Sequence, residues 1–338
     1  MKSILLRGGR VIDPVNALDG QYDVLVRGGE IAAVERVGTR MKLEDASIVD
    51  ASGCWIVPGL IDPHVHLRDP GFPEKETILT GLRAAAAGGF TTVAAMANTS
   101  PVNDNPATTR YVLERAKEAH SARLVPVSAV TYGLRGTELV DFAAMVDAGA
   151  RLFSDDGIPI DDAMVLSRAM DETRSLGYAV SLHEEDRALS CDGALNAGAA
   201  SKHLGVSGYP DSAESQRVRR DLALAIGSGA AVHVAHVSTA ESLELIRAAR
   251  RHGAQVTCEV TPHHFTLDES AALIWGPNAK MNPPLRRHDD VEAIQAAIVD
   301  GTIDMIATDH APHDPKSKQM DQLGAFFGPG HPVQHLEE

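Results

Sequence analysis

One pattern repeats along most of the chain from Trp55 onward: a short β-prone segment, a loop and then a helical segment. Eight β-prone segments begin near Ile56, Thr91, Arg123, Arg151, Tyr178, Ala231, Gln255 and Ile303. Several of the helical segments between them end at glycine, which often terminates a helix. Eight strands that alternate with helices over roughly 250 residues predict an α/β fold of the (β/α)8 TIM-barrel type. An open doubly wound sheet is the alternative, but no glycine-rich phosphate loop follows the first strand.

The first 55 residues follow a different pattern. Their short β-prone segments are Ser3–Arg7, Tyr22–Val26, Ile31–Val34 and Ser47–Val49. Gly8-Gly9, Asp19-Gly20 and Gly28-Gly29 separate these segments as turns. We therefore expect residues 1–55 to form a small antiparallel sheet. Such a sheet should not be stable alone, because a few short strands bury little apolar surface.

The composition excludes several classes of partner. The 338 residues carry a formal net charge of -15, whereas a nucleic-acid-binding protein normally presents a basic surface. No run of about 20 apolar residues occurs, so no membrane span is expected. Three scattered cysteines do not suggest a disulfide framework, and the first residues lack the apolar core of a signal peptide, so a cytoplasmic location is expected. In so acidic a chain, an anionic substrate would need a specific local cation.

Polar side chains follow the predicted strands at the point where the strands end. They are His64, His66 and Arg68 for the first strand, Asn98 for the second, Asp155 and Asp156 for the fourth, His183 for the fifth, His236 for the sixth and Asp309 for the eighth. His64 and His66 close the apolar run Trp55 to Ile61, which predicts a buried strand, and alternate residues of a strand share a face. Packing would favour Val, Ile and Leu at these ends. Because the chemistry of such barrels lies at the carboxyl ends of the strands, we expect a metal site there.

Six of these residues are candidate metal ligands: His64, His66, Asp156, His183, His236 and Asp309. Six ligands are too many for one tetrahedral zinc ion, but they suit two metal ions that share a carboxylate. Asp155 remains an alternative to Asp156, because a slip of one residue along the strand would exchange them. We expect His233 to face away from the site. His263 and His264 should support the ligands from outside.

Four segments resemble the signature motifs of the dihydroorotases, a family within the amidohydrolase superfamily. They are Asp62-Pro63-His64-Val65-His66-Leu67-Arg68, Glu259-Val260-Thr261-Pro262-His263-His264, Lys280-Met281-Asn282-Pro283-Pro284-Leu285-Arg286, and Ala307-Thr308-Asp309-His310-Ala311-Pro312-His313 with Lys318 beyond it. The resemblance extends from the first residues to about Gly328. It implies a centre of two zinc ions per chain on a barrel, with a β-sandwich formed partly from the N-terminal segment.

The resemblance also divides the candidate ligands between the two zinc ions. One group is His64, His66 and Asp309, and the other is His183 and His236. Many relatives bridge the ions with a carboxylated lysine, but the fourth strand here offers Asp155 and Asp156 and no lysine, which is similar to the type I dihydroorotases. The spacing to His183 favours Asp156 as the bridge. The missing lysine argues against hydantoinase, dihydropyrimidinase and allantoinase, the alternative cyclic amidohydrolases.

The implied activity is the reversible hydrolysis of dihydroorotate to N-carbamoyl-L-aspartate in de novo pyrimidine (UMP) biosynthesis, with Asp309 as general base and then acid. The implied substrate-binding residues are Arg68, Asn98 and His313 for the carboxylate, Asn282 for the ring, and Phe327 and Gly328 in a loop that closes over the substrate. The alternative to an enzyme is a non-catalytic scaffold subunit. The partners implied are a second copy of the chain and aspartate transcarbamoylase.

The sequence departs from the family pattern near its end. Residues 329–338 match no expected segment, so we assign residues 56–328 to the barrel and 329–338 to an atypical tail. The last barrel helix and the C-terminal strands of the β-sandwich are expected to be missing. Their absence would expose apolar surface and open strand edges, which predicts a less stable scaffold around a complete set of site residues.

Overall fold

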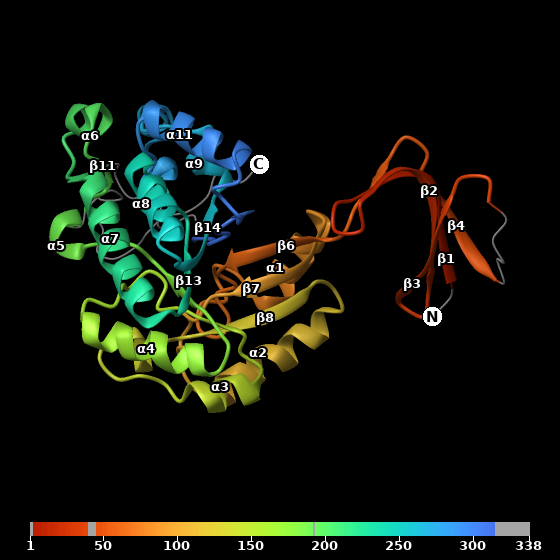
Figure 1. Ribbon diagram of the computed structural model, residues 1–338, viewed down its shortest axis with the longest axis horizontal. Helices are drawn as coiled ribbons and strands as arrows, with labels where there is room; N and C mark the ends of the chain where they lie inside the picture. Colours follow the sequence, from red (N-terminus) through yellow and green to blue (C-terminus); the bar gives the residue numbers. More distant parts are fainter. Residues whose placement is uncertain (1–2, 40–44, 192, 315–338) are drawn as a thin grey trace. The chain divides into compact units, whose positions relative to one another are not determined.

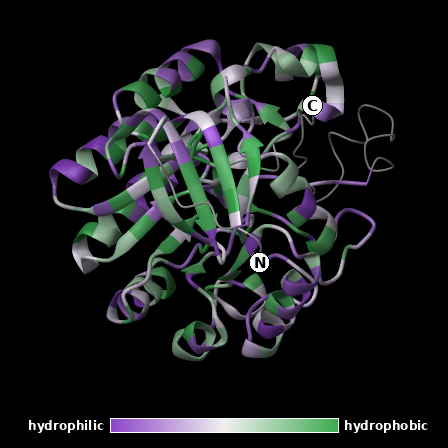
Figure 2. Cartoon of the chain, turned by 90° about the vertical axis from the view of Figure 1, so that its right-hand side faces the viewer, coloured by the Kyte–Doolittle hydropathy of each residue, from purple (hydrophilic) through white to green (hydrophobic). Residues whose placement is uncertain are grey.

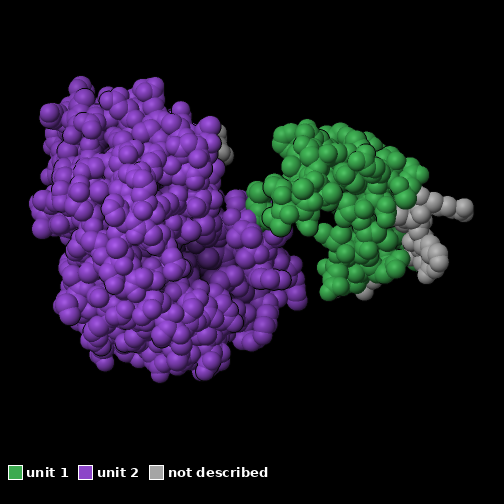
Figure 3. Space-filling model, in the orientation of Figure 1, with its two compact units in different colours: residues 1–60 green, residues 61–338 purple. Residues whose placement is uncertain are grey.

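The computed structural model describes residues 3–39, 45–191 and 193–314. The chain divides into two compact units, Met1–Leu60 and Ile61–Glu338 (Figure 3). The first unit contains a β-sheet, and the second contains a barrel of strands and helices. The predicted boundary at residue 55 and the predicted tail at 329–338 stay predictions, and the tail lies outside the described residues.

The first unit is a five-stranded mixed sheet. Its strands are β1 (Ser3–Asp13), β2 (Leu18–Arg27), β3 (Glu30–Arg36), β4 (Ala46–Asp50) and β5 (Trp55–Ile56). β2 is antiparallel to both β1 and β3, but β4 and β5 run parallel to β1. The expectation of a purely antiparallel sheet is therefore wrong, because β4 pairs with β1 and not with β3, its neighbour in the chain.

The first barrel strand begins later than the sequence predicts. Trp55–Ile56 pair with β1 in the first unit, and the barrel strand β6 spans Leu60–Val65. Pro58 lies between the two strands and has no N–H group for a sheet hydrogen bond. The run Trp55 to Ile61 is also not buried as expected, since Trp55 is 71% exposed and Ile61 is 65% exposed.

The second unit is built around an eight-stranded sheet (Figure 1). Its strands are β6 (Leu60–Val65), β7 (Phe90–Ala95), β8 (Arg123–Ser128), β9 (Leu152–Phe153), β10 (Val180–Leu182), β13 (Ala231–Val234), β14 (Gln255–Val260) and β15 (Met305–Ile306). Adjacent strands follow chain order, and the pairs from β7 to β15 are parallel. Val65 forms a parallel bridge with His310, which joins the two ends of the sheet. The predicted TIM-type barrel is confirmed.

Helices follow the barrel strands in turn (Figure 1). The longer ones are α1 (Ile78–Ala87), α2 (Pro106–Ala119), α3 (Phe142–Ala148), α4 (Ala163–Ser175), α7 (Asp211–Ser228), α8 (Ala240–Arg251) and α11 (His288–Val299). Shorter elements lie in the connections after β10 and β14: α5 (Arg187–Ser190), β11 (Leu195–Asn196), α6 (Ala199–Leu204), β12 (Gly208–Tyr209), α9 (Pro262–Thr266) and α10 (Ala271–Trp275). Within the described part of the chain, no helix is long and apolar enough to cross a membrane.

The main apolar core lies between the strands and the surrounding helices. It includes Phe153 of β9, Leu166 and Met170 of α4, Ile246 of α8 and Ile294 of α11. Leu166 and Met170 are one helical turn apart, so they lie on the same face of α4. In Figure 2 the helices carry both hydrophilic and hydrophobic residues, as expected for elements with one buried face. This packing holds the strands, and therefore the loops that follow them.

A buried hydrogen-bond cluster joins the first barrel strand to the last. The Asp62 carboxylate accepts hydrogen bonds from the backbone N–H of Thr308 over 3.1 Å and from the Thr308 hydroxyl. The same carboxylate accepts from the backbone N–H of His64 over 3.2 Å. In addition, the N–H of His66 donates to the carbonyl of His310 over 2.6 Å. These contacts fix the relative positions of the two strands that carry three candidate ligands.

The cysteines offer a test of this core. Cys258 in β14 is buried, and that burial raises the pKa of its thiol to about 12, whereas Cys54 and Cys191 are exposed. Because the thiolate is the reactive form, we expect an alkylating reagent to modify Cys54 and Cys191 in the native chain and Cys258 only after denaturation. Mass spectrometry of the alkylated peptides measures this difference. Rapid modification of Cys258 in the native chain would contradict the described fold.

Candidate metal centre

The six predicted ligands lie together at the carboxyl ends of the barrel strands. His64 is in β6 and His66 follows it, while the others follow β9, β10, β13 and β15; these are Asp156, His183, His236 and Asp309. All six side chains are buried. The barrel thus brings together residues that are up to 245 positions apart in the numbering, from His64 to Asp309.

Three of these residues converge on one point between the first and last strands. Asp309 Oδ1 lies 3.0 Å from His66 Nε2 and 3.5 Å from His64 Nε2. The ligand atoms of His64, His66 and Asp309 all lie within 4.8 Å of one another. This spacing suits three ligands of a single cation.

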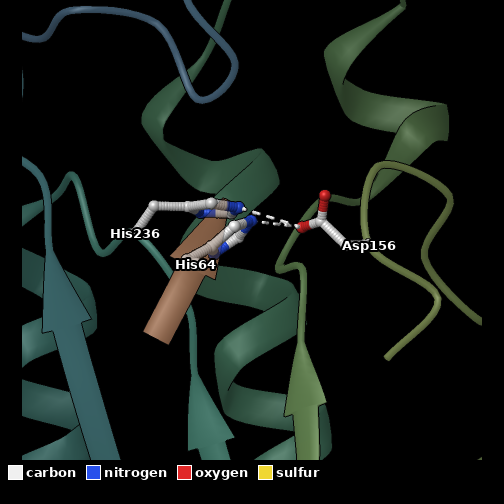
Figure 4. A group of neighbouring side chains, drawn as sticks. All are labelled: His64, Asp156 and His236. Atoms are coloured by element: carbon white, nitrogen blue, oxygen red, sulfur yellow. Dashed lines mark ion pairs between the residues drawn. The ribbon is translucent and has the colours of Figure 1, made fainter. Parts of the chain in front are cut away.

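Asp156 connects this group to the remaining histidines. Its Oδ1 lies 3.5 Å from Nε2 of both His64 and His236, and the two rings are directed at the same oxygen (Figure 4). His183 Nδ1 lies 3.4 Å from Asp156 Oδ1 and 3.0 Å from His236 Nε2. Asp156 Oδ2 lies 3.4 Å from His66 Nε2. The carboxylate therefore faces all four imidazoles.

The neighbouring Asp155 is directed away from this cluster. Its carboxylate accepts hydrogen bonds from the N–H groups of Val130 and Thr131 over 2.7 and 3.1 Å, and from the Thr131 hydroxyl. Burial raises the pKa of Asp155 to about 6, although those hydrogen bonds oppose the rise. Asp155 thus anchors the loop after β8, and this geometry favours Asp156 as the shared ligand.

The chemistry of the cluster fits a divalent metal. His64 Nε2 and Asp156 Oδ1 are buried and have no hydrogen-bond partner among the described residues. Leaving such atoms unsatisfied is costly, and a cation between them would satisfy both. Burial would raise the pKa of Asp309, but His64 and His66 lower it to about 2, so the carboxylate is ionised at neutral pH. Imidazole nitrogens and carboxylate oxygens are the ligands that zinc accepts.

Oxygen atoms lie behind three of the histidines. His64 Nδ1 is 2.7 Å from Glu259 Oε1, His66 Nδ1 is 2.8 Å from Asn98 Oδ1, and His183 Nε2 is 3.3 Å from Glu185 Oε2. Such outer partners orient a metal-binding imidazole and set its tautomer. The sequence analysis missed the roles of Glu185 and Glu259. The sequence offered two signals for Glu259, its place at the start of the segment Glu259 to His264 that resembles a family motif and its position near the end of a predicted strand.

The predicted substrate-binding residues lie beside the cluster. Arg68, Asn98 and Asn282 line a small cavity together with His66, Asp156, Gly157, His183 and His236. Arg68 Nη2 lies 3.3 Å from His313 Nε2, and Arg68 Nε donates to the carbonyl of Pro312 over 3.2 Å. Asn282 Nδ2 lies 3.4 Å from both His183 Nε2 and Glu185 Oε2. Phe327 and Gly328 lie outside the described residues.

Three site residues have a left-handed backbone: Arg68 (φ 58°), His236 (φ 33°) and Asp309 (φ 50°). This conformation is uncommon for residues other than glycine, and it places a side chain where an extended strand would not. Each of the three lies just past the end of a barrel strand. The backbone strain at these residues therefore lies at the strand ends, next to the candidate ligands.

Two further histidines, His233 and His264, lie outside the group of six candidate ligands. His233 Nδ1 lies 2.9 Å from the Thr257 hydroxyl, and its Nε2 lies 3.1 Å from Glu259 Oε2. His264 lies between the Thr261 hydroxyl and the carbonyl of Pro283, at 2.7 and 3.0 Å. Burial lowers the pKa of His264 to about 4, so the ring is neutral at pH 7 and can bridge the two loops.

Comparisons with known proteins identify the family. The model of the Dihydro-orotase-like family matches residues 53–242. The dihydroorotase of Syntrophotalea carbinolica is 50% identical over 94% of this chain and 74% of that protein. The dihydroorotase of Syntrophus aciditrophicus is 47% identical over the same shares of the two chains. The chain belongs to the dihydroorotase family.

Dihydroorotases are metal-dependent cyclic amide hydrolases, so the chain is an enzyme of this class. Similar solved structures agree on the fold. L-hydantoinase (dihydropyrimidinase) from Arthrobacter aurescens has a TM-score of 0.82 at 23% identity and covers 94% of this chain and 71% of its own. D-hydantoinase (dihydropyrimidinase) from Thermus sp. has a TM-score of 0.77 at 23% identity, with 98% and 73% covered. At this identity the likeness shows the fold alone, and the sequence relatives favour dihydroorotase over the hydantoinase alternative.

The position of Asp156 leads to a first test of the centre. Replacing Asp156 by Ala should lower the affinity for zinc at least about tenfold, because the variant lacks the carboxylate that faces all four imidazoles. Competition with a fluorescent chelator measures the affinity. Asp289→Ala is the control, since Asp289 is exposed in the first turn of α11. Equal zinc affinity in the Asp156 variant and the wild type would contradict the assignment.

Proposed function

We propose that the chain binds two zinc ions and interconverts dihydroorotate and N-carbamoyl-L-aspartate, a step of de novo pyrimidine biosynthesis. The observation that carries this proposal is a buried cluster of four histidines and two aspartates in a member of the dihydroorotase family. One ion would be held by His64, His66 and Asp309 and the other by His183 and His236, with Asp156 shared. When bound, the ions supply Lewis acidity, which lowers the pKa of a water molecule and polarises the ring carbonyl.

Asp309 is the proposed general base and acid. Its carboxylate is ionised and lies beside His64 and His66, where water and substrate would meet. As water attacks the ring carbonyl carbon, Asp309 accepts a water proton while the new C–O bond forms. The ring C–N bond then breaks, and Asp309 returns the proton to the departing nitrogen. The same steps in reverse close the ring.

Arg68 is the proposed anchor for the substrate carboxylate. Its guanidinium is half-buried beside the cavity, with His313 next to it and Asn98 on the same cavity wall. A planar guanidinium can hold a carboxylate through two parallel hydrogen bonds. It also supplies the local positive charge that an anionic substrate needs in a chain with a net charge of -15. Asn282, in the connection after β14 and beside His183, is the proposed contact to the ring.

Removing the Asp309 carboxylate tests the proposed chemistry. Asp309→Asn preserves the shape of the side chain, and asparagine tolerates the left-handed backbone at this position. We expect kcat to fall at least about 100-fold, since the variant has no base for proton transfer. Chromatographic assay of N-carbamoyl-aspartate with the zinc-loaded chain measures the rate, and Asp300→Asn on the surface is the control. Turnover close to the wild-type rate would refute the role.

Replacing Arg68 separates substrate binding from chemistry. Arg68→Gln should raise KM for dihydroorotate about 10- to 100-fold and change kcat less, because it removes a charge-assisted contact to a group that does not react. Arg83→Gln is the matched control, since Arg83 is exposed on α1. Steady-state kinetics give both constants. An unchanged KM would rule out Arg68 as the anchor.

We also propose that the enzyme is cytoplasmic, that it forms a homodimer, and that it associates with aspartate transcarbamoylase. Light scattering of the purified chain, alone and mixed with that transcarbamoylase, tests the two associations. The non-catalytic scaffold is the second candidate function. It is disfavoured because the buried cluster retains all six candidate ligands, and it would be supported by zinc binding without turnover.

A further inference from the structure

We infer that Glu259 is a positioning residue of the metal centre, a carboxylate that fixes the orientation and tautomer of His64 and holds the loop of His236 beside it. This inference rests on the proposed metal centre. Glu259 lies in β14, which contributes none of the six candidate ligands. It contacts groups from two other strands, β6 and β13, and so joins parts of the barrel that each deliver a ligand.

The first contact sets the tautomer of His64. Glu259 Oε1 lies 2.7 Å from His64 Nδ1, and an ionised carboxylate can only accept a hydrogen bond. His64 Nδ1 must therefore carry the proton in this contact. In the neutral ring, Nε2 then has a lone pair, and Nε2 is the atom that lies 3.5 Å from both Asp156 and Asp309. The contact thus prepares His64 for a metal.

The second contact concerns the backbone beside His236. The N–H of His236 is directed at Glu259 Oε1 over 3.4 Å, and the next N–H, of Val237, donates to the Glu259 carbonyl over 2.9 Å. His236 has a left-handed backbone with φ 33°, which needs support from its surroundings. Glu259 supplies that support from the adjacent strand. It therefore contacts one candidate ligand, His64, at the imidazole ring and a second, His236, at the backbone.

The Glu259 carboxylate is buried in the barrel core, where an ionised group is stable only if its partners compensate for the lost hydration. The side chain is 1% exposed, and the imidazoles that contact it within the described ranges are those of His64 and His233. A carboxylate buried in a barrel core destabilises the fold unless its partners compensate for lost hydration. His233 Nε2 lies 3.1 Å from the second oxygen, so both oxygens are occupied by imidazoles. This arrangement orients Glu259 so that Oε1 remains on His64.

Asn98, Glu185 and Glu259 each contact the ring of a candidate ligand, but they differ in charge and in the length of the contact. His66 faces a neutral amide, that of Asn98, and the contact from Glu185 to His183 is longer at 3.3 Å. His64 has the shortest contact, to a charged group, and it belongs to both groups of ligand atoms that lie within 4.8 Å of one another. Loss of Glu259 should therefore weaken metal binding more than loss of a carboxylate elsewhere in the core.

The test is zinc affinity in a set of variants of the full chain, measured by competition with a fluorescent chelator. Glu259→Gln preserves size and removes the charge, and we expect zinc affinity to fall about 10- to 100-fold. Glu259→Asp, which restores the charge on a shorter side chain, should recover part of the loss. Glu214→Gln is the matched control: Glu214 is buried in α7, and its contacts are with Ser238, Thr239 and Arg286. It should lower the melting temperature without weakening zinc binding.

Each outcome decides between the hypotheses. Zinc affinity of Glu259→Gln within twofold of the wild type would overturn the inference and leave the metal centre standing. An equal loss in Glu214→Gln would also overturn it, because the effect would then be general to buried carboxylates. A wild-type chain that binds no zinc would overturn the proposed function itself. If Glu259→Gln does not fold, long-range proton–nitrogen spectra of the zinc-loaded wild type decide: a proton on Nδ1 of His64 supports the inference, and one on Nε2 overturns it.

Discussion

The proposed metal centre depends on one buried carboxylate, that of Asp156. Its two oxygens face imidazoles from β6 and from the ends of β10 and β13. Alone, a carboxylate in this position would be far less stable than in water. Positive charge from the histidines, or from a bound cation, is what allows it to remain ionised and buried, and those imidazoles in turn are held where the barrel places them. The fold and the charge balance of the site therefore support each other.

Barrel closure is the second condition for this arrangement. Two ligands come from the first strand and its end, and a third comes from the end of the last strand, so the group exists only if these strands are joined. The hydrogen bonds from Thr308 to Asp62 and from His66 to the carbonyl of His310 provide that connection. The left-handed backbone at Arg68 and Asp309 lies directly beside it. A strained conformation at a strand end persists only where the surrounding structure is firm, which is the case here.

Much of the site follows from sequence because strand ends are easy to locate. A (β/α)8 barrel places the carboxyl ends of all strands on one face, so histidines and aspartates at those ends were predicted to meet, and they do. Periodicity could not choose between Asp155 and Asp156, because that choice depends on how the backbone turns after β9. Glu259 was missed because its partner His64 is 195 residues away in the sequence. Glu185 is only two residues from its partner His183, and what the sequence does not show is how the backbone after β10 turns to bring the two side chains together. The parallel pairing of β4 and β5 with β1 was missed because local turn signals favour hairpins.

We propose that six residues from five strands hold two metal ions around Asp156. The most direct measurement is an anomalous difference map from crystals of the zinc-loaded chain. We expect two zinc peaks, both in contact with Asp156, one also bound by His64, His66 and Asp309 and the other by His183 and His236. Zinc peaks that do not contact Asp156, or no peak at the strand ends of a zinc-loaded crystal, would contradict it.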